Sequence, residues 1–204
     1  MFVSLFTIRI VLNALGAEDY GINNVVGGFV TLFAFLSSTL NSASLRFFSY
    51  SIGQKNYCKL SEYFTMSFWC YVLLAFIIIV LAETIGLWFV YYKLTIPEER
   101  LSAAIIVYQC SILSFGYKLM TVPYNSLVIA HERMNLYAIL GILECLSKLA
   151  VTYLLYISPF DKLITYTVLW TLMTIAIDSY YIIYGLKHFK ESRIKRFWNS
   201  SVFK

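Results

Sequence analysis

The stretch YFTMSFWCYVLLAFIIIVLA, residues 63–82, decides the fold class of this chain. No charged side chain interrupts it, and about 20 mostly apolar residues are what a helix needs to cross the hydrocarbon core of a bilayer. A barrel strand would alternate polar and apolar residues, and an open sheet edge would leave backbone groups unpaired in hydrocarbon. We therefore predict a membrane-spanning helix that continues to about residue 92.

The composition of the whole chain agrees with this prediction. Hydrophobic residues make up 60% of the 204 residues and charged residues 13%, whereas soluble domains carry roughly 25% charged residues. A soluble fold of this size could not bury so much apolar surface, so the bilayer is predicted to be its solvent. The net charge of +5 does not indicate nucleic-acid binding, because no soluble domain remains to carry a basic patch.

Six segments are predicted as spanning helices because each is long and mostly apolar. They cover about residues 1–15, 21–48, 63–92, 101–130, 135–157 and 162–187. The expected fold is therefore all-α, a polytopic six-helix membrane bundle over residues 1–187. Most loop lysines and arginines fall on the side of the N-terminus, which favours a cytoplasmic N-terminus. In the first connection, Gly16 suits a helix C-cap and Asp19 suits the N-cap of the next helix.

The last residues, 188–204, combine basic side chains with Phe189, Ile194, Phe197 and Trp198. Such a basic amphipathic segment is expected to lie in the membrane interface, next to anionic lipid headgroups. It could also lead to a following helix, so we expect the chain to be part of a larger transporter.

No catalytic or metal site is predicted. The four cysteines lack CxxC spacing and the two histidines stand apart, so cysteines buried as small hydrophobic residues are the favoured interpretation. The extramembrane loops are also too short to carry a catalytic domain. We therefore expect neither an enzyme nor a cofactor.

The second predicted helix carries a stripe of small and polar side chains. At 100° per residue the stripe stays close to one line along the helix, and it consists of Asn24, Gly28, Thr31, Ser38, Ser42 and Arg46. The stripe indicates the wall of a water-filled cavity with a cationic contact. The alternative is close packing of helices through small residues, with Arg46 reaching back to the interface.

The first predicted helix repeats this pattern with Arg9 and Asn13. A charge at mid-helix costs about 2.5–3.5 kcal/mol on insertion scales, so such a residue usually faces a cavity or a partner. A guanidinium group binds phosphate oxygens through two parallel hydrogen bonds. Arg9 and Arg46 on neighbouring helices therefore favour a phosphate or pyrophosphate ligand.

The later helices carry further polar residues. A stripe with spacings of 3 and 4 runs along the fourth predicted helix, beside a kink expected at Pro123, and comprises Ser111, Ser114, Lys118, Thr121 and Asn125. Glu144 and Lys148 stand at i and i+4 and are predicted to neutralise each other. Glu83 and Asp178 are expected near the interfaces, without a chemical role.

Three sequence segments resemble a known family. RIVLNALGAEDYGINNVVGG (residues 9–28), VPYN (122–125) and IAHERMN (129–135) are similar to the first hairpin, the fourth helix and the following loop of bacterial polysaccharide-export flippases. These O-antigen-type transporters belong to the multidrug/oligosaccharidyl-lipid/polysaccharide superfamily. The resemblance covers essentially the whole chain, but only the N-terminal lobe of the family.

The resemblance implies two six-helix lobes around a central cavity and alternating access. It implies flipping of an undecaprenyl-pyrophosphate-linked oligosaccharide across the bacterial cytoplasmic (inner) membrane, for lipopolysaccharide and other surface polysaccharides. The missing C-terminal lobe or a second chain would then be a partner. Arginines in the first two helices of related flippases contact substrate, which places Arg9 and Arg46 in such positions.

The predicted substrate-binding residues are Arg9, Asn13, Asn24, Ser42, Arg46 and Lys118. A cation-coupled multidrug exporter of the same fold is the main alternative, although the first helix lacks the carboxylate that it would need. A membrane-embedded enzyme or a non-transporting helper bundle would also be built from such helices.

Overall fold

The computed structural model describes residues 2–31, 34–92, 97–157 and 161–192, and in these ranges every regular element is helical. The helices, in chain order, are α1 (Phe2–Leu15), α2 (Ala17–Thr31), α3 (Ala34–Gly53), α4 (Tyr57–Leu81), α5 (Leu87–Tyr92), α6 (Glu98–Ala130), α7 (Met134–Ile157) and α8 (Lys162–His188). Five residues in π-helical form, Ala82–Gly86, join α4 to α5, and a 3-10 turn, Lys190–Ser192, follows α8. The expected all-α fold is confirmed.

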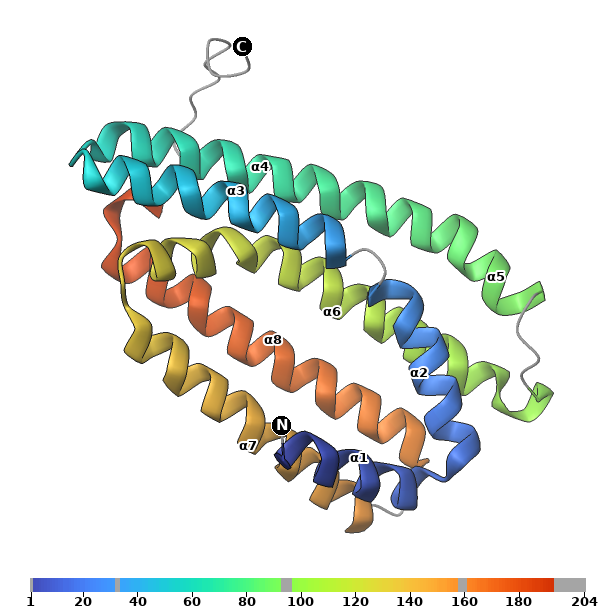
Figure 1. Cartoon of the computed structure of the whole chain (residues 1–204). Helices are drawn as coiled ribbons and strands as arrows, with labels where there is room; N and C mark the ends of the chain where they lie inside the picture. Colours follow the sequence, from blue (N-terminus) through green and yellow to red (C-terminus); the bar gives the residue numbers. More distant parts are fainter. Residues whose placement is uncertain (1, 32–33, 93–96, 158–160, 193–204) are drawn as a thin grey trace.

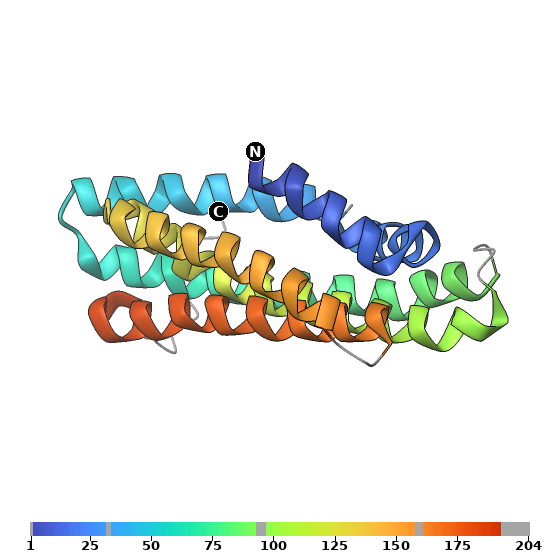
Figure 2. The same cartoon turned by 90° about the horizontal axis from the view of Figure 1, so that it is seen from below.

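The bundle is elongated, and its long helices run along one common axis. Figures 1 and 2 show α3, α4, α6 and α8 lying lengthwise, with α7 beside α8 and the shorter α1 and α2 gathered toward one end. Helix α6 contacts α2, α3, α4 and α8. It is therefore the central helix around which the others are arranged.

Four helical segments in the described structure are long and apolar enough to cross a membrane: Tyr57–Tyr92, Arg100–Ala130, Met134–Leu155 and Lys162–His188. The first of them comprises α4, the π-helical residues and α5. They match the last four predicted spanning helices to within a few residues, except at the start of the first. In the described part of the chain α1 and α2 have only 14 and 15 residues, and α3, with 20, is less apolar. The predicted count of six spanning helices is therefore not confirmed.

The single helix predicted over residues 21–48 corresponds to two helices, α2 and α3, which follow different directions in Figure 1. The prediction of one continuous polar face fails for this reason. A period of 100° per residue holds only along an uninterrupted helix. Asn24 and Gly28 belong to α2, whereas Ser42 and Arg46 belong to α3.

Of the predicted interfacial segment 188–204, the structure describes only residues 188–192, and Ile194, Phe197 and Trp198 lie outside the described residues. The described part turns into the bundle. The Phe189 ring stacks on His131, with 4.3 Å between centroids, and the Ser192 hydroxyl donates to the Gly185 carbonyl. Both Phe189 and Ser192 are buried, so this short stretch packs against protein.

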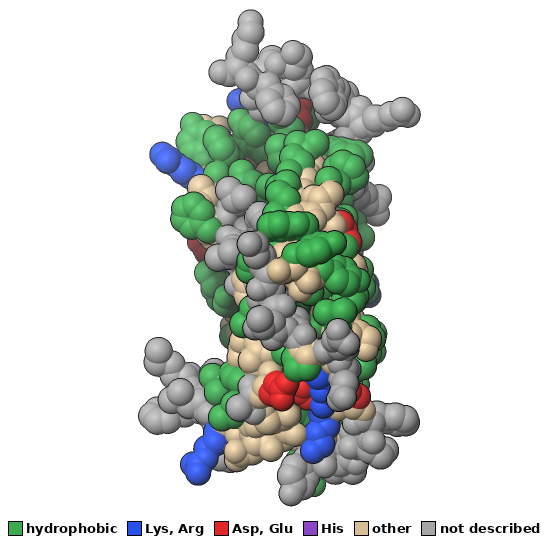
Figure 3. Space-filling model, turned by 90° about the vertical axis from the view of Figure 1, so that its right-hand side faces the viewer, with side chains coloured by type: hydrophobic (Ala, Val, Ile, Leu, Met, Phe, Trp, Pro, Cys, Tyr) green, Lys and Arg blue, Asp and Glu red, His purple; other side chains and the backbone are tan. Residues whose placement is uncertain are grey.

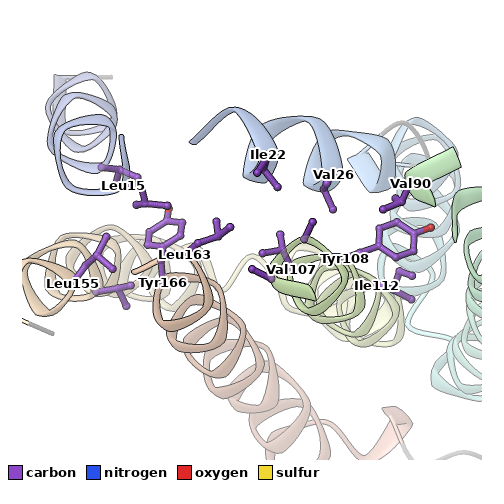
Figure 4. Close-up of a cluster of buried hydrophobic side chains, with 14 of the residues drawn as sticks. Leu15, Ile22, Val26, Val90, Val107, Tyr108, Ile112, Leu155, Leu163 and Tyr166 are labelled. Atoms are coloured by element: carbon purple, nitrogen blue, oxygen red, sulfur yellow. The ribbon is translucent and has the colours of Figure 1, made fainter. Parts of the chain in front are cut away.

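Three clusters of buried hydrophobic side chains hold the helices together, and the two larger ones join the most helices. One, drawn in Figure 4, joins α1, α2 and the N-terminal part of α6 to α7 and α8 through residues that include Val26, Val107, Leu155 and Leu163. The other surrounds Phe64 and Tyr124 and joins α3, α4, α6 and α8. At Gly185 an added Cβ would lie 2.7 Å from the Tyr124 ring, so glycine permits this close approach of α8 to α6.

Two salt bridges connect the N-terminal parts of α2, α6 and α8. Arg100, at the start of α6, lies 3.3 Å from Asp19 on α2 and 2.7 Å from Asp161, the N-cap of α8. Figure 3 shows acidic and basic side chains gathered at this end of an otherwise largely apolar face. The predicted cap at Gly16 is confirmed, since this residue follows α1 with φ of 86°. Asp19 lies inside α2 and is not its N-cap.

Removing Arg100 should destabilise the bundle, more at neutral than at acidic pH. Burial raises the pKa of Asp19, and Arg100 opposes this shift. Without Arg100, ionised Asp19 loses its counter-ion, and the cost fades once acid protonates the carboxyl. Because Arg100 is 39% exposed, we expect the free energy of unfolding to fall by about 1–2 kcal/mol at neutral pH. This loss lies between the values for exposed and for buried ion pairs.

Thermal unfolding of Arg100→Ala in detergent, at neutral and at mildly acidic pH, measures this loss. Asp19→Asn in the same background should restore most of the stability at neutral pH. An equal loss at both pH values would show that the guanidinium acts by packing and not by charge.

Candidate binding cavity

A cavity of about 680 Å³ opens between α2, α6, α7 and α8. Drug-sized and cofactor sites usually measure about 300–1,000 Å³, so its size is that of a binding site. Helices α6 and α8 form its floor, and α2 and α7 flank it. The lining residues are Asn23, Asn24, Gly27, Gly28, Ser37, Ser111, Ser114, Phe115, Lys118, Leu119, Val122, Glu144, Lys148, Tyr166, Thr167, Trp170, Thr171 and Thr174.

Hydroxyl groups hold the two floor helices together. The Ser114 hydroxyl lies 3.1 Å from the Thr171 hydroxyl, and the Tyr117 and Ser179 hydroxyls lie 2.6 Å apart. Ser114 and Thr171 also line the cavity. Small polar side chains both allow helices to approach and hydrogen-bond across them, so these hydroxyl groups join α6 to α8 beside the cavity.

Two lysines supply positive charge to the cavity. Lys118 extends from α6, and Lys148 extends from α7 with its Nζ 5.4 Å from the centroid of the Trp170 ring. Among the described residues neither lysine has a carboxylate oxygen within the 4.0 Å of an ion pair. The prediction that Glu144 and Lys148 neutralise each other is therefore wrong. Lys148 instead contacts an aromatic face, which attracts cations.

A second cavity, of about 310 Å³, adjoins the first. Three residues line both: Lys118, Glu144 and Thr174. The second cavity is otherwise lined by Asn125, Tyr137, Leu140, Gly141, Ile177, Asp178 and Tyr181. Lys118 and Glu144 therefore stand at the junction between a larger space with a second lysine, Lys148, and a smaller space with a second carboxylate, Asp178.

Two residues that line the smaller cavity each have a buried oxygen atom without a partner. Asp178 Oδ2 and Asn125 Oδ1 are buried and have no hydrogen-bonding partner in the described structure. Asp178 is 9% exposed. A buried polar atom without a partner costs about 1–3 kcal/mol, so Asp178 and Asn125 are the costly polar residues in the lining of this cavity.

Only some of the predicted binding residues line the cavities. Asn24 and Lys118 line the large cavity. Arg9, Asn13, Ser42 and Arg46 are all exposed and line neither cavity. The Ser42 hydroxyl donates to the Ser38 carbonyl within its own helix. The structure therefore does not bring Arg9 and Arg46 together with Lys118 in one cavity.

The stripe on the fourth predicted helix is the more useful pattern. Ser111, Ser114 and Lys118 line the large cavity, and Asn125 lines the small one. A matching stripe on α8 was not recognised from the sequence. It has spacings of 4, 3 and 4 and consists of Thr167, Thr171, Thr174 and Asp178. These spacings keep one side of a helix polar, and they could have identified Asp178 as a cavity residue.

The described residues contain no group of three or more His, Cys, Asp or Glu side chains placed to hold a metal ion. Comparison of the chain with protein-family models, with curated proteins and with solved structures finds no match. The functional argument therefore depends on the cavities and on the residues that line them.

Proposed function

We propose that this chain is a lobe of a membrane transporter that moves an anionic, lipid-linked oligosaccharide across the bacterial cytoplasmic membrane. The observation that carries the proposal is the large cavity, in which Lys118 and Lys148 lack ion-pair partners among the described residues. Ammonium groups held within membrane-spanning helices are costly unless they face water or bind an anion. A phosphate or pyrophosphate group would stabilise both.

The rest of the lining suits a sugar attached to that phosphate. Asn23, Asn24 and Ser37 offer amide and hydroxyl groups, and Trp170 of α8 offers an aromatic ring. Sugars present hydroxyl groups at their edges and apolar C–H groups on their faces, so they match such a mixed lining. The exposed apolar side chains of the spanning helices, such as Leu73 and Phe76, would contact lipid. The isoprenoid chain of the substrate would lie among these lipids, outside the bundle.

The test is binding of a prenyl pyrophosphate, such as farnesyl pyrophosphate, to the full chain in nanodiscs of zwitterionic lipid. We expect saturable binding of the pyrophosphate, and much weaker binding of the uncharged prenol of the same chain length. Equal binding of both compounds would show only partition of the isoprenoid into lipid and would contradict the proposal.

A cation-coupled drug exporter is the second candidate. It is favoured by Glu144 and Asp178, which place carboxylates in the smaller cavity, although not in the first or second helix, where we expected a carboxylate for this function. An exporter of this type should bind a lipophilic cation, such as ethidium, in competition with protons. The same nanodisc preparation can be tested with both ligands, and the tighter ligand decides between the two functions.

A further inference from the structure

A polar pair, Glu83 and Gln109, lies on the outer surface of α4 and α6. The Gln109 side-chain amide donates a hydrogen bond of 3.2 Å to the Glu83 carboxyl group. Glu83 is partly exposed, Gln109 is exposed, and neither lines one of the two cavities. At about 100° per residue, Gln109 lies about 180° around α6 from Lys118. The polar pair therefore faces away from the cavities, toward the surroundings of the bundle.

The polar pair lies within a membrane span and not at its end. Trp88, Tyr91 and Tyr92 are exposed at the end of the same span, and such aromatic side chains mark the interface between lipid and water. Glu83 precedes Trp88 by about 7 Å of helix, and Cα–Cβ bonds tilt toward the N-terminus of a helix. The Glu83 side chain therefore leans toward the membrane interior, away from the interface.

The local structure of α4 and α6 fixes the position of Glu83. This residue belongs to the π-helical segment Ala82–Gly86, and single π-helical turns often occur at functional sites. The buried Tyr108 hydroxyl of α6 donates to the Ala82 carbonyl at the start of this segment, at 2.7 Å. The π-helical segment is therefore attached to α6 one residue before Gln109.

The polar pair leaves much of its hydrogen-bonding capacity unused. In the described part of the chain neither side chain makes another hydrogen bond, and no lysine or arginine nitrogen lies within 4.0 Å of Glu83. A carboxylate can accept about four hydrogen bonds, and an amide has a second N–H donor and a carbonyl acceptor. Such groups are costly against lipid tails, so this surface favours a polar partner within the membrane.

We propose that two copies of this chain associate in the membrane through this face, around a twofold axis along the membrane normal. Copies with the same orientation place their polar pairs at the same depth. A twofold interface brings the same patch of both copies together, so the free N–H of Gln109 in one copy donates to Glu83 in the other, and the reverse. The patch is self-complementary because it carries both a donor and an acceptor.

A second copy fits this face better than a lipid headgroup does. Headgroups lie beyond the aromatic residues at the end of the span, whereas Glu83 leans away from that end. Ile106 and Leu113 stand three residues before and four residues after Gln109, on the same side of α6, and both are exposed. They would pack around the polar contacts and exclude lipid. The cavities lie on the other side of α6, so the association does not depend on what they bind.

The test is self-association of the full chain in liposomes of zwitterionic lipid, measured by single-molecule photobleaching over a range of protein-to-lipid ratios. One dye is attached to the exposed Cys58, after Cys70, Cys110 and Cys145 are replaced with alanine. We expect the fraction of two-step bleaching to rise with protein density as in a monomer–dimer equilibrium. A chain that never exceeds the two-step fraction of random co-occupancy overturns the proposal.

Glu83→Leu should lower the association constant by about tenfold or more, because two symmetry-related hydrogen bonds between helices are lost together. Gln109→Leu should have the same effect. Glu83→Gln keeps a hydrogen-bond acceptor and should keep most of the association. Ser42→Leu is the control for loss of an exposed polar group, since Ser42 bonds only within α3 in the described structure, and it should leave the association unchanged.

Unchanged association in both Glu83→Leu and Gln109→Leu overturns this interface, and so does an equal loss in Ser42→Leu. Circular dichroism and thermal unfolding show whether each variant is folded. If Glu83→Leu does not fold, the contrast between Gln109→Leu and Glu83→Gln decides. Prenyl pyrophosphate binding is measured separately, so failure of the dimer and failure of the proposed function are distinguishable.

Discussion

Replacing Lys118 with glutamine should weaken binding of prenyl pyrophosphate by about tenfold to a hundredfold. Hydrogen bonds to charged groups contribute about 1.5–3 kcal/mol, and each 1.4 kcal/mol corresponds to a factor of ten in affinity. Glutamine keeps most of the length of the side chain and a hydrogen-bond donor, so the loss reports mainly the charge. Lys118 lines both cavities, so its replacement removes a positive charge from the place where they adjoin.

Lys148→Gln provides the matched comparison. Its Nζ lies over the Trp170 ring, and Lys148 lines the large cavity but not the small one, so its loss should also weaken binding of the anion. Equilibrium binding to the purified variants in nanodiscs measures both effects.

Substitution of the arginines tests whether the anion binds in the large cavity or at the polar stripe of the second predicted helix. Arg46 is exposed on α3 and lines neither cavity, so Arg46→Gln should change affinity by less than threefold, about 0.6 kcal/mol. If Arg46→Gln or Arg9→Gln removes binding while Lys118→Gln does not, the anion binds where the sequence pattern placed it. In that case the cavity lysines are not its contacts.

Sequence periodicity located the site only in part, for a physical reason. On α6 the polar stripe of Ser111, Ser114 and Lys118 lies within one continuous helix, so its members stay on one side and line the cavity together. The other stripe extends over both α2 and α3, and only its first residues reach the cavity. A pattern of spacing carries no information about where the helical direction changes, as it does between α2 and α3.

Contacts between helices explain the remaining differences. The spacing of Glu144 and Lys148 predicts that they can meet on the surface of an isolated helix. In the folded bundle Lys148 meets Trp170 of α8 instead, a partner that no pattern within α7 could reveal. The last four spanning helices, by contrast, were found with nearly correct bounds because length and hydropathy alone decide whether a helix can cross a bilayer.

Replacing Phe64 with alanine should be among the most destabilising single substitutions in the bundle, at about 3 kcal/mol. Phe64 is fully buried on α4 and contacts Phe48 of α3 and Tyr124 of α6, with ring centroids 6.1 and 5.1 Å apart. Soluble cores lose about 3–5 kcal/mol in such a change. The lower end applies here, because lipid solvates a separated phenylalanine nearly as well as the core does.

Phe76→Ala is the matched control, since Phe76 lies on the same helix but is 67% exposed. Its side chain faces the surroundings in both the packed and the separated state, so its removal should change stability by less than about 0.5 kcal/mol. Unfolding of both variants in mixed micelles with increasing SDS measures the difference. Equal losses for the two variants would show that transfer of the side chain out of water, and not packing between helices, determines the stability. A large loss for Phe64 alone shows that α3, α4 and α6 are held by van der Waals contact, which is the force left to join helices when the solvent is as apolar as they are.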